Sequence, residues 1–320
     1  MASPATTTYG FIGLGQMGHG MAKNIRFKVP QTSQLVVFDV NKQAVVSFVQ
    51  EHKGVGVKAV SSPREVAEIA DVIMTSVPQG SHVKDVFLHP GHGLLSARKR
   101  PSHEILFLEL STIDPKASRE VANAINIGEW GKFVDAPCSG GAMGAERGSL
   151  SFMVGCSDEL YPRVFEICKL MGSEDSIFHC GELGSGLQIK LLNNYLSALT
   201  AMATAETYNI GLRGGLDARK LDRVINASSG MNFNSKINNP VPGMTQANAA
   251  SHGYVGGFSI ELCLGVLELG FKTAEDVGAK TVLGKPMLEA YRDAASYEEF
   301  QGKDSKVIYK WLGGENPDLS

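Results

Sequence analysis

The sequence "GSGLQIKLLNNYL", residues 184–196, contains one lysine and two asparagines in an otherwise apolar stretch. Lys190 and Asn194 are four residues apart, so a helix would place both on one face. Between residues 187 and 206 the only charged side chains are Lys190 and Glu206, which predicts a helix that is buried on all sides. Burial lowers the pKa of a lysine from its ordinary value of about 10.4, so such a side chain can exchange protons. The alternative is a lysine on the solvated face of an amphipathic helix.

A glycine-rich sequence, "YGFIGLGQMGHG", contains Gly13, Gly15 and Gly18 in the pattern GxGxxG, after a predicted strand and before a predicted helix. In this context the glycines permit a tight turn, a close approach of the backbone to a pyrophosphate, and close helix–strand packing. The amide groups at the start of the helix can bind phosphates. The predicted cofactor contacts in this loop are Gly13, Leu14, Gly15, Gln16, Met17 and Gly18.

The second strand of the same unit ends at Asp39, 21 residues after Gly18. A carboxylate at this position can accept hydrogen bonds from ribose hydroxyls and repels a 2′-phosphate, so the predicted cofactor is NAD rather than NADP. Lys42, three residues further on, leaves the NADP alternative open.

Two further predicted strands end in "SVPQGSH" and "ELSTIDP". Ligands of open parallel sheets bind at the carboxyl ends of the strands, where these residues are expected to lie. His82 could act as a general base, but an exposed histidine without a partner is the favoured interpretation. For Ser111 and Thr112, helix capping and ligand contact are both open.

The sequence "DAPCSGG" places Ser139, Gly140 and Gly141 directly after another predicted strand. Adjacent glycines allow close approach of a ligand to the backbone, and free N–H groups could hold a carboxylate or an oxyanion. A simple glycine-rich turn is the alternative.

The elements that must position these residues alternate between strands and helices as far as Cys180. Eight short apolar runs rich in β-branched residues predict strands, and capping signals such as Ser62 before Pro63 predict helices between them. This alternation predicts an α/β domain of the Rossmann type, a doubly wound parallel sheet, over residues 1–183. Residues 184–320 are expected to form an all-helical second domain, with helices at 186–211, 217–228, 258–277 and 284–297.

The length, net charge and cysteine content of the chain limit the classes of protein to which it can belong. With 320 residues, a net charge of −3 and no clean apolar run of membrane-spanning length, the chain is not expected to bind nucleic acid or a membrane. Five scattered cysteines without a CxxC pair predict reduced thiols, and no cluster with metal-ligand spacing is evident. About eight residues precede the first predicted strand, which predicts a cytoplasmic protein, or a mitochondrial matrix protein if a presequence was removed.

Seven motifs together resemble the β-hydroxyacid dehydrogenase family in order and spacing: "FIGLGQMGHGMAKNI", "STIDP", "DAPCSGG", "SFMVG", "GSGLQIKLLNN", "NNPVPG" and "GYVGGF". The resemblance extends from Tyr9 to about Leu312. It implies oxidation of a 3-hydroxy acid, such as 3-hydroxyisobutyrate in valine breakdown, to its semialdehyde, with hydride transfer to NAD.

The resemblance also implies roles for individual residues. Lys190 takes the place of the catalytic acid/base, and Asn194 that of the asparagine beside it. A homodimer or homotetramer is implied, with contacts in the second domain. Substrate binding is implied for Ser139, Gly140 and Gly141, and cofactor contact for Val77, Pro78, His82 and Thr112.

The sequence departs from the family pattern after "GYVGGF", where Gly265 and Val266 replace a Lys-Asp pair. Met231 and Lys236 also stand where the family has arginine and aspartate. Loss of a cation could weaken binding of a substrate carboxylate by about 1–3 kcal/mol, unless Lys236 or Lys272 compensates. Two alternatives therefore stay open: an NAD(P)H-dependent reductase of small semialdehydes or imines, and a nucleotide-binding scaffold without catalysis.

Overall fold

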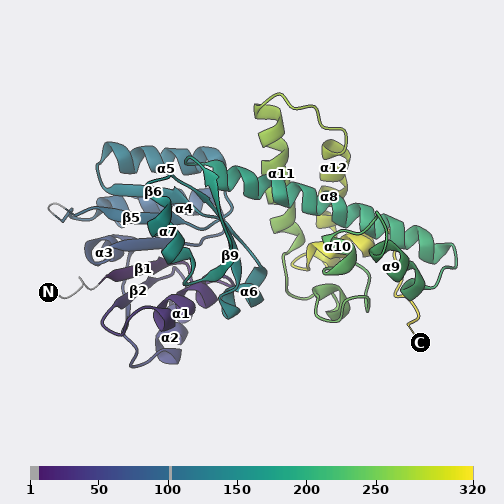
Figure 1. Ribbon diagram of the computed structural model, residues 1–320, viewed down its shortest axis with the longest axis horizontal. Coiled ribbons are helices and arrows are strands. Elements are labelled where there is room, and N and C mark those ends of the chain that lie inside the picture. The colour runs from purple at the N-terminus through teal and green to yellow at the C-terminus, as the bar shows by residue number, and fades with distance from the viewer. Residues whose placement is uncertain (1–6, 101–102, 320) are drawn as a thin grey trace. The chain divides into compact units, whose positions relative to one another are not determined.

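The computed structural model describes residues 7–100 and 103–319, and the chain divides into two compact units at the boundary between Lys190 and Leu191. The first unit is an α/β sheet domain and the second is helical, as Figure 1 shows for each unit separately. The predicted fold class is confirmed.

A nine-stranded sheet forms the centre of the first unit. Its order is β3-β2-β1-β4-β5-β6-β8-β7, with β9 paired to β8. The pairs among β1 to β6 are parallel, whereas β8 runs antiparallel to β6 and β7. All eight predicted strands are present; the sheet is not parallel throughout, and the two-residue strand β7 was not predicted. The strands are β1 (Thr8–Ile12), β2 (Gln34–Phe38), β3 (Val57–Ala59), β4 (Val72–Thr75), β5 (Ile105–Glu109), β6 (Gly131–Asp135), β7 (Cys138–Ser139), β8 (Leu150–Gly155) and β9 (Gly172–Gly181).

Helices cover both faces of this sheet, with α1 and α2 on one side and α4 and α5 on the other (Figure 1). The predicted cap at Ser62 is present, since its hydroxyl accepts the N–H of Glu65. The Asp114 carboxylate caps α5 in the same way by accepting the N–H of Lys116. The helices of this unit are α1 (Gly18–Lys28), α2 (Lys42–Glu51), α3 (Pro63–Ile69), α4 (Gly80–Leu88), the 3₁₀ turn Leu94–Ser96, α5 (Pro115–Ile127), α6 (Gly141–Arg147) and α7 (Tyr161–Cys168).

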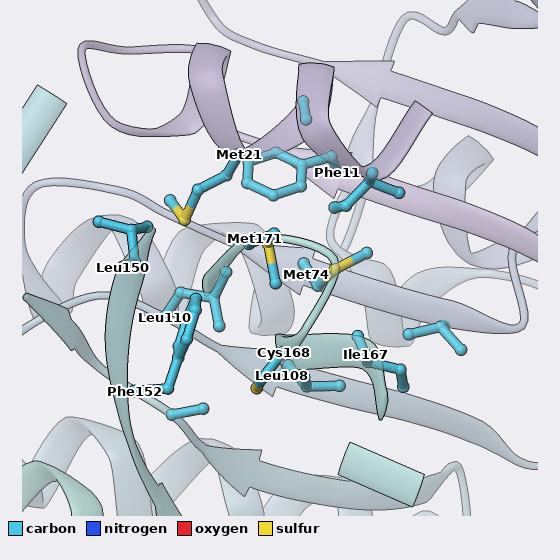
Figure 2. Close-up of a cluster of buried hydrophobic side chains, with 14 of the residues drawn as sticks. Phe11, Met21, Met74, Leu108, Leu110, Leu150, Phe152, Ile167, Cys168 and Met171 are labelled. Atoms are coloured by element: carbon cyan, nitrogen blue, oxygen red, sulfur yellow. The ribbon is translucent and has the colours of Figure 1, made fainter. Parts of the chain in front are cut away.

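One hydrophobic core of the first unit lies between the sheet and the helices α1 and α7. Figure 2 shows side chains from the strands and from α1 and α7 that converge there, and all of them are buried. Burial of such side chains stabilises the fold by about 1.5–3 kcal/mol each. This core fixes the carboxyl ends of the strands, from which the candidate site is built. The labelled residues are Phe11, Met21, Met74, Leu108, Leu110, Leu150, Phe152, Ile167, Cys168 and Met171.

The second unit is helical, and no described residue between 191 and 319 lies in a strand; the only pairing there is an isolated bridge between Ser259 and Asp304. Its core is built around Tyr208, Tyr291 and Tyr309. All five cysteines are free thiols, as predicted. The helices are α8 (Ser185–Arg213), which begins in the first unit, α9 (Ala218–Asn226), α10 (Phe233–Lys236), α11 (Ile260–Asp276), α12 (Gly284–Ser296) and α13 (Ile308–Trp311), with 3₁₀ turns at Ala249–His252, Glu298–Phe300 and Ser305–Val307.

Helix α8 is not buried on all sides, so that prediction is wrong. The side chains of Ile189, Leu192 and Leu196 form an exposed apolar stripe, while Lys190 is buried. The helix is poor in charge because it has two apolar faces. Residues of the same chain bury one of them, and the other is exposed. Among the described residues, no helix is both long and apolar enough to cross a membrane.

Candidate functional site

The glycine-rich loop between β1 and α1 has the geometry that the sequence predicts. Gly13 has a φ of +98°, and a Cβ atom added there would lie 2.1 Å from the carbonyl oxygen of Ser76. A Cβ atom on Gly18 would lie 1.8 Å from the Gly13 carbonyl oxygen, whereas one on Gly15 would meet nothing within 4 Å. The loop is thus pressed against the sheet on one side and open on the other. No hydrogen bond within the described residues uses the N–H groups of Gly15 and Gln16, so this cradle fits the phosphates of a dinucleotide.

Asp39 lies at the end of β2 and is half-buried. Its carboxylate accepts hydrogen bonds from the N–H of Leu14 at 2.6 Å and from that of Asn41 at 2.7 Å. The side chain therefore fixes the glycine-rich loop to the second strand. Each carboxylate oxygen retains a lone pair that can accept from a ribose hydroxyl.

A pocket of about 760 Å³ lies beside the glycine-rich loop. Helix α6, which follows Gly140 (φ +136°), forms its other wall and replaces the simple turn that the sequence suggests. Asn24 holds α6 against α1, because its side-chain amide donates to the carbonyl oxygens of Gly20 and Ala145 at 2.9 and 2.8 Å. Sequence reasoning missed Asn24. The lining residues are Leu14, Gly15, Gln16, His19, Gly20, Ala142, Met143, Glu146 and Arg147.

A buried carboxyl group lies behind the two other predicted cofactor segments. Glu109, at the end of β5, is 1 % exposed, and burial raises its pKa to about 7. It accepts hydrogen bonds from the Thr75 hydroxyl and from the N–H of Ser111. The Ser111 hydroxyl in turn accepts the N–H of Val77 at 2.8 Å. Ser111 is therefore used to join the two segments, and Glu109, which the sequence did not single out, anchors both.

The raised pKa of Glu109 makes stability depend on pH. The folded state binds this proton more tightly than the unfolded state, so the stabilisation is complete below about pH 4.5 and is lost as the pH rises through about 7. The free energy of unfolding of Glu109→Gln, relative to the wild type, should therefore increase by about 2–3 kcal/mol between pH 5 and pH 8. Urea denaturation at both pH values measures this difference. Glu104→Gln, which removes an exposed carboxylate just before the same strand, is the control; an equal difference at both pH values for Glu109→Gln would contradict the expectation.

The other predicted cofactor contacts lie near the same edge of the sheet. Val77 and Thr112 are half-buried and Pro78 is exposed, in the segments that follow β4 and β5. His82 is exposed on the first turn of α4. No hydrogen bond or ion pair within the described residues involves its ring, in agreement with the interpretation as a surface histidine.

Lys190 lies on the second turn of α8 and is 6 % exposed. Burial lowers the pKa of its ammonium group, and the nearby thiol of Cys138 has the opposite, smaller effect. No hydrogen bond or ion pair within the described residues involves its side chain. Because Cys138 precedes Ser139 in β7, the structure brings Lys190 close to the predicted substrate loop. A buried amine without a partner is suited to proton exchange with a ligand.

Asn194 follows Lys190 by one helical turn and is half-buried. Its side-chain oxygen is 3.4 Å from the side-chain nitrogen of Asn193. Ser139 is half-buried, whereas Gly140 and Gly141 (φ +68°), the latter at the start of α6, are exposed.

The first turn of α8 is bound by Asp135, the last residue of β6, which sequence reasoning missed. Its carboxylate accepts the N–H groups of Gly184 at 2.6 Å and Leu187 at 2.7 Å. The side chain is 1 % exposed, and burial raises its pKa to about 6. An aspartate at the end of a strand that precedes a glycine-rich loop was the only signal in the sequence.

One group of possible metal ligands was not predicted from the sequence. Atoms of Asp85, His89 and His92 lie within 4.8 Å of one another at the end of α4. However, His89 Nδ1 accepts the N–H groups of Gly91 and His92 at 3.1 and 3.3 Å, so the other ring nitrogen of a neutral His89 carries the proton. Metal binding would require the loss of these bonds.

The residues that depart from the family pattern lie in the second unit. Gly265 is exposed on α11, with nothing within 4 Å of an added Cβ atom. Lys272 lies 3.7 Å from the Asp276 carboxylate, and Lys236 is exposed on α10. These positions give no reason to assign either lysine to a substrate.

Comparison with known families gives two matches that together span most of the chain. The model described as the NAD binding domain of 6-phosphogluconate dehydrogenase matches residues 8–181. The model described as NAD-binding of NADP-dependent 3-hydroxyisobutyrate dehydrogenase matches residues 184–312.

Similar curated proteins come from eukaryotes and bacteria. A probable mitochondrial 3-hydroxyisobutyrate dehydrogenase of Dictyostelium discoideum is 36 % identical over 312 residues, which cover 98 % of this chain and 92 % of the relative. The mitochondrial 3-hydroxyisobutyrate dehydrogenase of Mus musculus is also 36 % identical, covering 97 % and 88 %. The 3-hydroxyisobutyrate dehydrogenase of Pseudomonas aeruginosa is 34 % identical, covering 97 % and 100 %.

Similar solved structures have the same two-part fold. The 3-hydroxyisobutyrate dehydrogenase of Mycobacterium tuberculosis, solved with L-serine, superposes with a TM-score of 0.84 at 29 % identity and covers 96 % of this chain and 99 % of that one. An imine reductase from Pseudomonas sp. superposes with a TM-score of 0.56 at 15 % identity, covering 96 % and 99 %, and shares only the fold.

Proposed function

Because the chain belongs to the 3-hydroxyisobutyrate dehydrogenase family, we propose that the side chain of Lys190 is the general acid/base in the oxidation of a 3-hydroxy acid to its semialdehyde. Both matching family models describe NAD-binding domains, so the chain is an NAD(P)-binding oxidoreductase. The single observation that carries the assignment is the buried amine of Lys190 beside β7, which has no hydrogen-bond or ion-pair partner among the described residues. The substrate that we propose is 3-hydroxyisobutyrate, after which the relatives are named, or a close analogue.

The residues of this chain handle the proton. In its neutral form Lys190 accepts the proton of the substrate hydroxyl, and in the reverse reaction its ammonium donates to the aldehyde oxygen. Asn194, one turn later, holds the substrate oxygen or orients the lysine. Ser139, Gly140 and Gly141 bind the substrate carboxylate through hydroxyl and backbone N–H groups. When bound, NAD supplies the hydride acceptor, C4 of the nicotinamide ring.

We assign cofactor binding to the glycine-rich loop (residues 13–18), Asp39, the Val77–Pro78 segment, His82 and Thr112. The open outer side of Gly15 supports this assignment for the phosphates, as do the N–H groups of Gly15 and Gln16, which make no hydrogen bond to any residue that the structure describes. The carboxylate of Asp39 supports a preference for NAD over NADP.

Removal of the Asp39 charge should relax this preference. Asp39→Asn keeps an acceptor for the Leu14 N–H but no longer repels a 2′-phosphate. The ratio of kcat/KM for NADP to that for NAD should rise about tenfold, which corresponds to about 1.4 kcal/mol. Steady-state kinetics with both cofactors measure the ratio. Asp217→Asn, a change at the exposed cap of α9, is the matched control; an unchanged ratio for Asp39→Asn would remove this residue from cofactor selection.

Three further assignments complete the proposal. Residues 1–183 form the cofactor domain and residues 184–320 the substrate and oligomerisation domain.

The exposed stripe of Ile189, Leu192 and Leu196 supports a homodimer or homotetramer. Sedimentation velocity tests this assignment, and a monomer at micromolar concentration would contradict it. The free cysteines fit a reducing compartment, either cytoplasm or mitochondrial matrix, and detection of the native protein in an oxidising compartment would exclude both.

A substrate panel tests the proposed reaction. NADH formation should be observed with 3-hydroxyisobutyrate. The panel should include 3-hydroxypropionate and serine, because Gly265 replaces a cation of the family pattern and the preferred 3-hydroxy acid is therefore to be tested. If no 3-hydroxy acid is oxidised while imines or small semialdehydes are reduced, the reductase alternative replaces the proposal. Tight NADH binding without any turnover would indicate a scaffold.

A further inference from the structure

The start of helix α8 is fixed by a buried carboxylate. Both oxygens of Asp135 are engaged: Oδ1 accepts the N–H of Gly184 and Oδ2 that of Leu187. The first N–H groups of a helix have no partner within the helix, and a negative charge near them is favourable. Asp135 thus holds the first turn of α8 from the end of β6.

The backbone around this carboxylate leaves no room for another arrangement. A Cβ atom on Gly186 would lie 2.1 Å from the carbonyl oxygen of Met153, so the first turn of α8 packs directly on β8. A Cβ atom on Gly155 would lie 2.3 Å from Asp135 Oδ1. The carboxylate is therefore confined between two strands and the start of the helix.

The attachment of the first turn of α8 to Asp135 determines where Lys190 lies. Leu187, whose N–H binds Asp135, precedes Lys190 by three residues, so the two lie on adjacent turns of one face. A bound first turn fixes both the rotation of α8 about its axis and its position along that axis. The Lys190 amine has no other partner within the described residues that could hold it in place.

We propose that Asp135 is a positioning residue for the proton transfer: by binding the N–H groups of Gly184 and Leu187 it fixes the amine of Lys190 relative to the loop Ser139–Gly141. The inference rests on the proposed function, because it assigns Asp135 an effect that acts through Lys190. It also distinguishes Asp135 from an ordinary helix cap, whose loss would lower stability without a selective effect on turnover.

A double-mutant cycle tests the inference. Asp135→Asn keeps the size of the side chain but presents an amide N–H₂ group to one of the two backbone donors. It should lower kcat with 3-hydroxyisobutyrate by about 10- to 100-fold, the effect of a misplaced acid/base, while the Kd of NADH changes less than twofold. In the Lys190→Ala background, the same change should alter the residual rate less than twofold. Asp217→Asn, which alters the cap of α9, is the matched control and should leave kcat unchanged.

The outcomes separate the two proposals. If Lys190→Ala itself has no effect, the assignment of Lys190 falls, and the inference falls with it. If Lys190→Ala is strongly impaired but Asp135→Asn is not, or if Asp135→Asn costs the same factor in both backgrounds, only the inference is overturned. Should Asp135→Asn fail to fold, Gly186→Ala displaces the first turn of α8 and leaves the Asp135 side chain itself unchanged. It should show the same loss of kcat with retained NADH binding, and an unchanged kcat would overturn the inference.

Discussion

Replacement of Lys190 by alanine is expected to lower kcat for oxidation of 3-hydroxyisobutyrate by about 10²- to 10⁴-fold, the usual contribution of a positioned acid/base. The structure supports a selective effect, because the side chain is buried and no hydrogen bond or ion pair within the described residues depends on it. The Kd of NADH should change less than twofold. Stopped-flow or steady-state detection of NADH measures the rate, and quenching of protein fluorescence measures NADH binding.

Lys132→Ala provides the matched control, since it removes an exposed lysine from β6 in the same unit. It should leave both quantities unchanged. A loss of less than tenfold in kcat for Lys190→Ala would contradict the assignment. Equal losses of kcat and of NADH affinity would indicate a structural role instead.

Replacement of Gly15 by alanine is expected to raise the Kd of NADH by about 10- to 100-fold, which corresponds to about 1–3 kcal/mol. The new methyl group meets no protein atom within 4 Å, and the backbone at this position needs no left-handed conformation. The thermal midpoint of unfolding should therefore stay the same. The loss arises because the methyl group enters the space through which the backbone approaches the pyrophosphate.

Gly13→Ala is the informative comparison for Gly15→Ala. At Gly13 the φ of +98° and a clash at 2.1 Å with the Ser76 carbonyl predict a lower thermal midpoint together with weaker NADH binding. The two neighbouring glycines thus separate a role toward the cofactor from a role in folding. If Gly15→Ala binds NADH as tightly as the wild type, the loop does not contact the phosphates as proposed.

The fold was predictable from the sequence because its signals are local. Short apolar runs such as "QLVVF" and caps such as Ser62 and Asp114 define strands and helices within a few residues. The glycine-rich loop was predictable for the same reason, since the demands on Gly13 and Gly18 come from their immediate backbone neighbourhood.

The groups that support the site were not predictable, because their partners are distant in the sequence. Asp135 binds the N–H of Leu187, 52 residues later, and Asn24 binds the carbonyl of Ala145, 121 residues later. Glu109 resembles any residue at a strand end until its register places it beside Thr75. Helix α6 was missed because two glycines at its start suggested a turn.

The pattern of charge in α8 was informative about Lys190 but misleading about the helix as a whole. A helix poor in charge can be covered by its own chain or present an apolar face to another copy, and the sequence does not distinguish these cases. Lys190 is buried by its own chain, whereas Leu192 and Leu196 are exposed.

The pH dependence of kcat in the two directions tests most directly that Lys190 carries the proton. Oxidation requires the neutral amine, so its kcat should rise with pH through the pKa of Lys190, which burial places below that of an exposed lysine. Reduction of the semialdehyde requires the ammonium, so its kcat should fall over the same pH range. Both limbs should be absent from the residual activity of Lys190→Ala. Limbs of the same sign in the two directions, or limbs that persist in Lys190→Ala, would contradict the role of Lys190.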